Sequence, residues 1–271
     1  RDRVISALKN KYINVVMSYE EMKKLYPMCR NNDFKITVTM VKREYDWIIT
    51  NIEGGDTTNN HYGLAVDLGS TTIIMQLVNL NNGEVIAEES IFNKQIKYGE
   101  DILTRIFYTK EQKNGLEEIC KSTVESFVDL LNKIKEKTNI NVYDSSIMIV
   151  SGNTTMTHFL LGINPWTIFQ SPFTPVFNES GFIKGKEIGI PIKGYVYCFP
   201  SVANYFGGDL VSGLLYTEIY KKNEISALID IGTNGELVIG NNDFLVAAAG
   251  AAGPALEGGI SKFGMRACSG A

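Results

Sequence analysis

One short sequence pattern occurs twice in the chain, and it restricts the possible folds more than any other feature. Residues 63–72 read GLAVDLGSTT, and residues 227–235 read ALIDIGTNG. Each copy is an apolar, β-type run that reaches an Asp, an apolar residue and a Gly, and then turns through small polar residues. Because an internal repeat reflects repeated structural units, it predicts two similar subdomains that face each other.

The segments that follow each copy predict a mixed α/β fold. Residues 63–68 and then residues 71–79 and 84–92 read as three strands, and the second copy is matched by strands at residues 227–231, 236–239 and 244–248. Between the two sets, strands at residues 146–150 and 195–199 alternate with helices at residues 99–108, 116–137, 153–161 and 208–221. This order predicts a mixed sheet covered by helices. Since only a Gly-rich segment and a short tail follow the last strand, we expect the second subdomain to be incomplete.

A polar, turn-rich segment ahead of the first copy predicts a domain boundary. It reads GGDTTNN over residues 54–60. Before it, the sequence predicts helices at residues 2–10 and 19–26 and strands at residues 35–41 and 46–53. We therefore expect three parts, which are a small α/β domain with its linker at residues 1–57, a first subdomain at residues 58–224 and the start of a second at residues 225–271.

The composition excludes several classes of function. With 271 residues, 44% hydrophobic and 21% charged residues and a net charge of -4, the chain is typical of a soluble globular protein without a basic nucleic-acid-binding face. No apolar run approaches the roughly 18 to 20 residues that cross a bilayer. The four cysteines lie far apart and form no CxxC pair, so we expect reduced thiols in a cytoplasmic protein.

The turn after each repeated Asp has the composition of a phosphate-binding loop. Gly69 and Gly232 allow a tight turn and a close approach to a ligand. Backbone amides and hydroxyl groups suit phosphate oxygens. The residues that offer them are Ser70, Thr71 and Thr72 in the first copy and Thr233, Asn234 and Gly235 in the second. We expect the two loops to bind the phosphates of one nucleotide from opposite sides, whereas either loop alone could be an ordinary hairpin turn.

Three aspartates are the candidate catalytic residues. Asp67 and Asp230 stand at the ends of the repeated strands, where a carboxylate would hold Mg²⁺ through water, because Mg²⁺ usually keeps several of its water ligands. Asp209 follows two glycines at the start of a predicted helix. It would orient a water molecule or Mg²⁺, or it would only cap the helix.

Other segments have a binding and a structural interpretation that the sequence does not separate. Asn153 and Thr154 open a helix and would contact an anion or cap that helix. Gly250 and Gly253 stand in a run of small residues that would admit a ribose or a phosphate, or would form a packing turn. Residues 93–95 (NKQ) and 98–101 (YGED) would line the cleft or cap the helix that follows them.

Five segments in succession resemble one known family. They are GLAVDLGSTT at residues 63–72, NKQIKYGEDI at 93–102, GNTTMTH at 152–158, DIGTNGE at 230–236 and AAGPALEG at 251–258. This succession resembles the reductive activators of corrinoid iron-sulfur proteins and of corrinoid methyltransferase systems, over residues 30–271. The Asp-containing loops are shared with the wider ASKHA superfamily of actins, sugar kinases and heat-shock chaperones, whereas GNTTMTH and AAGPALEG are particular to the family.

The resemblance implies a ribonuclease H-like, actin-type ATPase core with two similar subdomains. It also implies ATP-dependent reduction of a cobalt(II) corrinoid to cobalt(I), with ATP and Mg as cofactors and a corrinoid protein as partner. The electron would pass through an iron-sulfur cluster in a domain absent from this chain. By the same resemblance, residues 1–57 are the middle domain, which would form a homodimer contact, and Asp67, Asp230 and their loops are the phosphate site.

Two other functions remain as alternatives at this point. A small-molecule kinase of the same superfamily would need a catalytic base, for which Asp209 is the candidate. A non-catalytic fragment that docks a partner protein is the second alternative, because we expect much of the adenine site to lie outside this chain.

Overall fold

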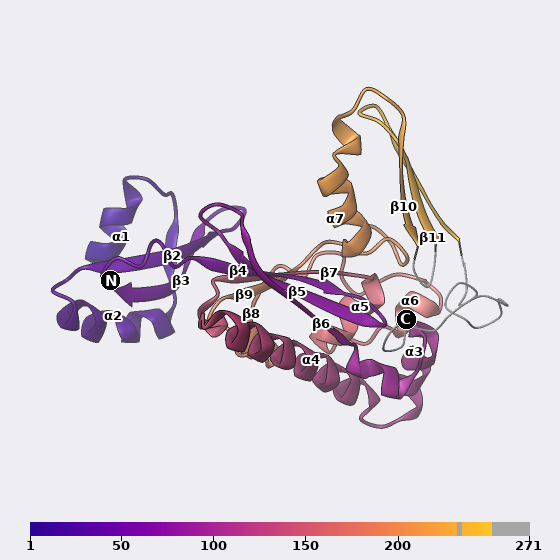
Figure 1. Ribbon diagram of the computed structural model, residues 1–271, viewed down its shortest axis with the longest axis horizontal. Coiled ribbons are helices and arrows are strands. Elements are labelled where there is room, and N and C mark those ends of the chain that lie inside the picture. The colour runs from indigo at the N-terminus through magenta and orange to yellow at the C-terminus, as the bar shows by residue number, and fades with distance from the viewer. Residues whose placement is uncertain (232–234, 251–271) are drawn as a thin grey trace.

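The computed structural model describes residues 1–231 and 235–250. Within these residues the chain forms a small domain near the N-terminus, a central six-stranded sheet and a separate three-stranded sheet (Figure 1). The mixed α/β fold predicted from the sequence is confirmed. In this part of the chain, no helix combines the length and the apolar character that a membrane span requires.

The N-terminal domain packs two helices against a three-stranded sheet. Its elements are α1 (Asp2–Lys9), β1 (Val15–Met17), α2 (Tyr19–Asn31), β2 (Ile36–Lys42) and β3 (Trp47–Gly54). The strand order is β1-β3-β2, with β1 parallel and β2 antiparallel to β3. Ser18 caps α2 by accepting a hydrogen bond from the Glu21 N–H, and Leu25 of α2 joins Ile5, Ile49 and Ile52 in the core.

The central sheet contains the first copy of the repeat. Its strands are β4 (Tyr62–Leu68), β5 (Thr72–Asn79), β6 (Val85–Phe92), β7 (Ile147–Gly152), β8 (Phe182–Lys184) and β9 (Tyr195–Cys198). The order is β6-β5-β4-β7-β9-β8, with β4, β7 and β9 parallel to one another and the other neighbours antiparallel. The ends of β4 and β7 therefore meet at one edge of the sheet.

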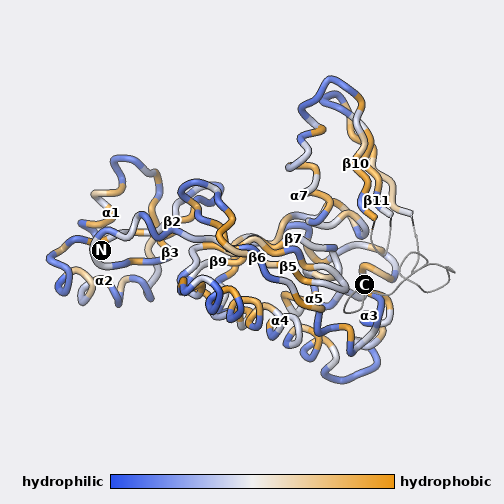
Figure 2. Tube along the Cα trace, in the orientation of Figure 1, coloured by the Kyte–Doolittle hydropathy of each residue, from blue (hydrophilic) through white to orange (hydrophobic). Residues whose placement is uncertain are grey.

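Helices cover the central sheet and bury an apolar core. They are α3 (Ile102–Glu111), α4 (Gly115–Thr138), α5 (Thr154–Leu161), α6 (Trp166–Phe169) and α7 (Gly208–Thr217). Along α4, hydrophobic and polar residues alternate, while the strands of the central sheet are largely hydrophobic (Figure 2). Phe127, Leu130 and Ile134 of α4 are fully buried in this core, so the apolar stripe predicted from their spacing is its contact with the sheet.

The second copy of the repeat forms the third sheet. Its strands β10 (Ser226–Ile231), β11 (Gly235–Gly240) and β12 (Leu245–Gly250) make an antiparallel meander, as β4, β5 and β6 do. Helix α7 contacts both β7 and β10, so it lies between the central sheet and the third sheet (Figure 1). The repeated sequence thus gives a repeated structure, and α7 joins the two copies.

Some boundaries differ from those that the sequence predicts. The helix expected at residues 208–221 ends at Thr217, because Glu218 adopts a left-handed conformation and the 3-10 helix Ile219–Lys221 follows. The helix expected from residue 99 begins at Ile102, after the 3-10 helix Lys94–Tyr98. The short elements β1, β8 and α6 were not predicted, since three or four residues carry no readable periodicity.

Candidate functional site

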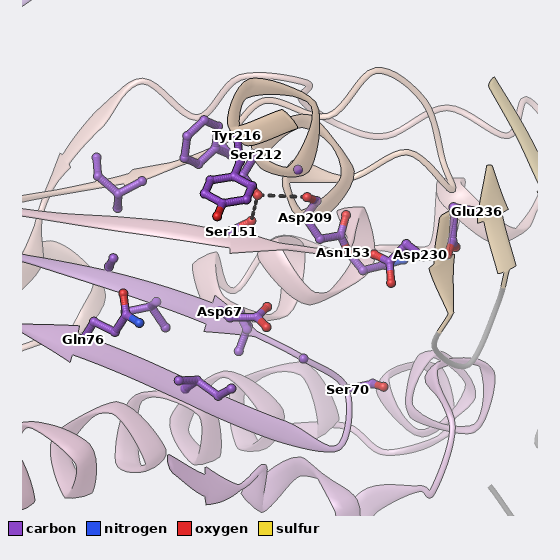
Figure 3. Close-up of a pocket in the computed structure, with 18 of the residues that line it drawn as sticks. Asp67, Ser70, Gln76, Ser151, Asn153, Asp209, Ser212, Tyr216, Asp230 and Glu236 are labelled. Atoms are coloured by element: carbon purple, nitrogen blue, oxygen red, sulfur yellow. Dashed lines mark hydrogen bonds between the residues drawn. The ribbon is translucent and has the colours of Figure 1, made fainter. Parts of the chain in front are cut away.

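A cavity of about 890 Å³ lies between the end of the central sheet, α7 and the third sheet (Figure 3). The polar and charged residues that line it are Asp67, Ser70, Gln76, Glu88, Ser151, Asn153, Asp209, Ser212, Tyr216, Asp230 and Glu236. They come from β4, β5, β6, β7, α7, β10 and β11 and from the turns between them. Both copies of the repeat therefore contribute to one cavity.

Asp67 stands one residue before the end of β4, at the centre of the sheet. It is paired with Ile74 on β5 and Ser151 on β7. Its side chain is solvent-accessible and lines the cavity. Burial and then the negative charge of Asp230 raise the pKa of Asp67 above its usual value. Asp230 holds the same position in β10. The charge of a residue in the second copy thus raises the pKa of a residue in the first copy.

Asp209 reaches the cavity because two glycines let α7 pack closely. A Cβ atom on Gly207 would lie 2.6 Å from the Gly152 carbonyl oxygen, and one on Gly208 would lie 2.6 Å from Cβ of Phe199. The start of α7 therefore rests directly on the ends of β7 and β9. Substitution of either glycine by a larger residue would move Asp209.

The environment of Asp209 disfavours its charged form. Burial raises its pKa to about 6, opposed by the hydrogen bond from the Leu210 N–H, and the charges of Asp230 and Asp67 add to the increase. The Leu210 N–H lies 2.8 Å from Oδ1 of Asp209. Gly207 is the N-cap of α7, so Asp209 is not the N-cap, but its carboxylate does bind a backbone amide of the first turn.

Two serines connect α7 to the central sheet beside Asp209. The hydroxyl groups of Ser151 on β7 and Ser212 on α7 lie 2.7 Å apart, and the Ser212 hydroxyl also donates to the Asp209 carbonyl oxygen at 2.8 Å (Figure 3). Ser212 and Tyr216 were not predicted from the sequence. They lie three and seven residues after Asp209 on one face of α7, and this helical spacing could have indicated them.

The first loop lies at the cavity, although not all of its predicted residues line it. Gly69 and Ser70 line the cavity, whereas Thr71 and Thr72 are not among the lining residues. A Cβ atom on Gly69 would lie 2.5 Å from the Thr72 carbonyl oxygen, so the glycine is required by the tight turn itself.

The second loop lies mainly outside the described residues. Gly232, Thr233 and Asn234 are not described, and neither is Gly253. Gly235 and Gly250 are described and pair with each other across β11 and β12. Neither of these two glycines lines the cavity.

In the segment GNTTMTH, Asn153 lines the cavity, whereas residues 154–158 are buried in the fold. Asn153 lines the cavity and also caps α5 by accepting a hydrogen bond from the Thr155 N–H at 2.9 Å. The binding interpretation of Thr154 is corrected, because the residue is fully buried and its hydroxyl donates to the Ala203 carbonyl at 2.9 Å. His158 is buried between the Thr154 carbonyl and the Val176 N–H.

The segment at residues 93–101 contains two helix caps, which is one of the two interpretations that the sequence allowed. Asn93 accepts a hydrogen bond from the Gln95 N–H, and Asp101 accepts one from the Thr104 N–H. Asn93 also contacts the first loop, since its side chain donates to the Gly69 carbonyl at 2.8 Å. Asn93 therefore connects the start of the 3-10 helix Lys94–Tyr98 to the turn at Gly69, which lines the cavity.

The carboxylates at the cavity suit a cation. Among residues 1–231 and 235–250, no group of three or more His, Cys, Asp or Glu side chains is close enough to bind a metal directly. Asp67 and Asp209 have raised pKa values to which the charge of Asp230 contributes, so a cation between these residues would stabilise their charged forms. Mg²⁺ with retained water ligands fits this arrangement.

Models of one protein family match almost the whole chain. The RACo linker region matches residues 1–59, the RACo middle region matches residues 62–222, and the C-terminal domain of RACo, the ASKHA domain, matches residues 224–271. The chain belongs to the RACo family. In this family the name middle region applies to residues 62–222, so the name that the resemblance gave to residues 1–57 is corrected to linker region.

Individual relatives agree with the family match. The corrinoid activation enzyme RamQ of Eubacterium limosum is 34% identical over 78% of this chain and 35% of its own length. A [Co(II) methylated amine-specific corrinoid protein] reductase of Methanosarcina barkeri is 27% identical over 78% of this chain and 40% of its own. A solved reductive activator for corrinoid, iron-sulfur protein superposes with a TM-score of 0.87 and 38% identity, over 96% of this chain and 42% of that one. The chain spans less than half the length of these relatives.

Proposed function

We propose that the protein carries out ATP-dependent reductive activation of a corrinoid protein, and that this chain supplies part of the MgATP site. The observation that carries the proposal is the cavity to which both repeated aspartates contribute, Asp67 and Asp230. Membership of the RACo family supports the corrinoid part, because relatives in that family are named as corrinoid activators or corrinoid protein reductases. The reaction reduces cobalt(II) to cobalt(I).

The proposal assigns roles to the turn at Gly69 and Ser70 and to the three aspartates of the cavity. The turn at Gly69 and Ser70 contacts the phosphates. Asp67 and Asp230 hold the water ligands of Mg²⁺, which would neutralise phosphate charge when bound. Asp209 orients the water that attacks the terminal phosphate, since its carboxylate is held at the start of α7 and its raised pKa makes it a better proton acceptor than a solvent-exposed Asp.

Coupling to reduction requires two states of the protein that ATP stabilises unequally. Reduction of a cobalt(II) corrinoid is uphill for ordinary cellular donors, and ATP changes this only by binding one state more tightly than another. The cavity lies between the central sheet and the third sheet, so closure of one sheet toward the other around the phosphates would provide such states.

The electron carrier and the partners belong to the same proposal. The described cysteines Cys29, Cys120 and Cys198 are free, and we place the iron-sulfur cluster in a region of the protein outside this chain. We also propose that the protein is cytoplasmic and forms a homodimer through residues 1–57.

The proposal is tested by linking ATP hydrolysis to corrinoid reduction. With a low-potential one-electron reductant supplied, the full-length protein should hydrolyse MgATP faster when a cobalt(II) corrinoid protein is added. The visible spectrum should then show transfer of one electron to the corrinoid and its conversion to cobalt(I). Sugars and small carboxylic acids should not stimulate hydrolysis. Phosphorylation of such a small molecule, without a response to the corrinoid protein, would favour the kinase alternative with Asp209 as base.

A further inference from the structure

The turn between β4 and β5 is held from one side along its whole length. The Asn93 side chain donates to the Gly69 carbonyl at 2.8 Å, and the Asn93 backbone N–H donates to the Thr71 carbonyl at 2.8 Å. Between them, Nη2 of Arg105 on α3 donates to the Ser70 carbonyl at 2.8 Å. Three successive carbonyl groups of the candidate phosphate loop thus point toward Asn93 and Arg105.

The geometry of the peptide bond then fixes the direction of the loop amides. A trans peptide unit points its C=O and its N–H in opposite directions. Within residues 1–231 and 235–250 the cis peptide bond is the one between Ser171 and Pro172, so the units of the loop are trans. The N–H groups of residues 70–72 therefore point away from Asn93 and Arg105. Those two side chains are buried behind the loop, whereas Gly69 and Ser70 line the cavity.

Arg105 is a buried cation without a carboxylate partner in the described part of the chain. Its side chain is fully buried, and its other donors bind the Gly99 carbonyl at 2.9 Å and Oε1 of Gln95 at 3.1 Å. It forms no ion pair with a described residue. A buried charge is costly unless an opposite charge or several hydrogen bonds compensate it.

A purely structural contact would not need this charge. Asn93, which is neutral, already binds two of the three loop carbonyls. The third carbonyl, that of Ser70, is bound by the guanidinium of Arg105, which lies on the opposite side of the loop from the cavity. An anion bound in the cavity would compensate this positive charge. The combination of oriented amides and a buried cation that forms no ion pair with a described residue fits a polyphosphate.

We propose that Asn93 and Arg105 are positioning residues for the phosphates of MgATP. They fix the amides of residues 70–72 so that these point away from the buried side of the loop, and Arg105 adds positive charge behind them. This inference rests on the proposed function, since it assigns the ligand of the same loop. It explains why NKQ and YGED stand between β6 and α3, where Asn93 contacts the loop and Gly99 and Gln95 hold the guanidinium.

The test compares KM and kcat for MgATP hydrolysis by the full-length protein in four variants. Arg105→Met removes the charge and the loop contact, and we expect KM to rise about 10- to 100-fold, because a charge-assisted hydrogen bond contributes about 1.5–3 kcal/mol. Arg105→Lys keeps the charge and should give an intermediate KM. Asn93→Ser keeps the cap but is too short to reach Gly69, and KM should rise about fivefold for one neutral hydrogen bond.

Lys110→Met is the matched control, because it removes a positive charge from the exposed side of the same helix α3. Its KM should stay within about twofold of the original value.

Thermal unfolding of each variant separates an effect on phosphate positioning from an effect on folding. A lower melting temperature of Arg105→Met with an unchanged KM would overturn the inference while leaving the proposed function intact. Absence of MgATP hydrolysis in the unsubstituted protein would instead reject the proposed function. If Arg105→Met does not fold, unchanged KM values in Arg105→Lys and Asn93→Ser would overturn the inference.

Discussion

Asp67 and Asp230 hold equivalent positions in the two copies of the repeat, each one residue before the end of its strand. We expect Asp67→Asn and Asp230→Asn each to weaken the use of MgATP about 10- to 100-fold, because each removes a charge-assisted contact of about 1.5–3 kcal/mol. Steady-state hydrolysis at varied Mg²⁺ and ATP measures the effect. Asp243→Asn, in the exposed turn between β11 and β12, is the control and should change nothing. Normal turnover in folded Asp67→Asn and Asp230→Asn variants would remove these residues from the site.

Asp209 differs from the other two aspartates in its contacts. Its carboxylate already accepts a hydrogen bond from the Leu210 N–H, and it is more enclosed than Asp67. If it orients the attacking water, Asp209→Asn should lower kcat by about 10²-fold or more and change the dissociation constant of MgATP little. Equilibrium binding and single-turnover hydrolysis of the same variant distinguish these effects. A weakened binding constant with unchanged turnover would make Asp209 a binding residue.

His158 is neutral in the fold because of its two partners. Nδ1 lies 2.7 Å from the Thr154 carbonyl oxygen, and Nε2 accepts a hydrogen bond from the Val176 N–H at 3.1 Å. Burial lowers its pKa below 6.5, opposed by the contact with the Thr154 carbonyl. The folded state therefore binds the proton less well than the unfolded state, so the contribution of His158 to stability is complete above pH 6.5 and is lost as the pH falls below it.

Thermal unfolding between about pH 5 and 8 tests this dependence, since histidine titrates in that range. His158→Phe keeps the stacked contact with Phe177 but cannot bind a proton, so its stability should fall less steeply toward acid than that of the unsubstituted protein. The slope that remains includes His61, whose pKa burial also lowers. Equal slopes in the two proteins would show that His158 does not titrate in this range.

At the scale of the element, the close contact of α7 with the ends of β7 and β9 positions Asp209. Gly207→Ala would place a Cβ atom 2.6 Å from the Gly152 carbonyl oxygen, so α7 would have to shift. We expect a loss of about 1–3 kcal/mol in the free energy of unfolding, measured with denaturant, together with lower kcat. Gly213→Ala on the same helix meets only the flexible end of the Leu228 side chain, with Cδ2 at 3.3 Å and Cδ1 at 3.9 Å. Its unfolding free energy should stay equal or rise, because alanine favours a helix.

The sequence predicted those elements whose pattern is local. The two hairpin sets, the amphipathic α4 and the helix that begins within GNTTMTH follow from periodicity and turn residues within one segment. Residues 162–194 were left unassigned, because α6 and β8 are too short to show a period and are held by tertiary contacts, such as the hydrogen bonds from Asn204 to the carbonyls of Ile168 and Phe173.

The repeat indicated the two aspartates of the candidate site, whereas the starts of two predicted helices indicated Asn153 and Asp209. Asp67 and Asp230 were found because the same pattern surrounds both. Ser151 and Ser212 come from a strand and a helix that are distant in the sequence, and only the parallel pairing of β7 and the packing of α7 bring them together. Arg105 was missed because a buried arginine on a helix has no local signature that separates it from a solvated one.

At the scale of the whole molecule, an ion-pair cluster joins the N-terminal domain to the central sheet. Glu20 on α2 lies 2.6 Å from Nζ of Lys186 and 3.3 Å from Nζ of Lys184, which belong to the β8 region. The hydrogen bonds from Lys186 and Lys184 lower the pKa of Glu20 to about 2. Because Glu20 is 39% exposed, solvent screens these contacts, and together they contribute about 0.5–1 kcal/mol.

The sign of the pH dependence follows from the lowered pKa. The folded state holds the Glu20 proton less well than the unfolded state, so the contribution of Glu20 to stability is fully present above pH 4.5 and is lost as the pH falls toward 2.

Glu20→Gln should therefore loosen the contact between the domains at neutral pH, and high salt should have the same effect on the original protein. Limited proteolysis in the segment 54–60 reports this contact, and cleavage should be faster in Glu20→Gln. Lys221→Met, which breaks an exposed ion pair with Glu218 within one segment, is the control and should leave cleavage unchanged. Equal cleavage of Glu20→Gln and the original protein at low salt would mean that apolar packing alone holds the two domains together.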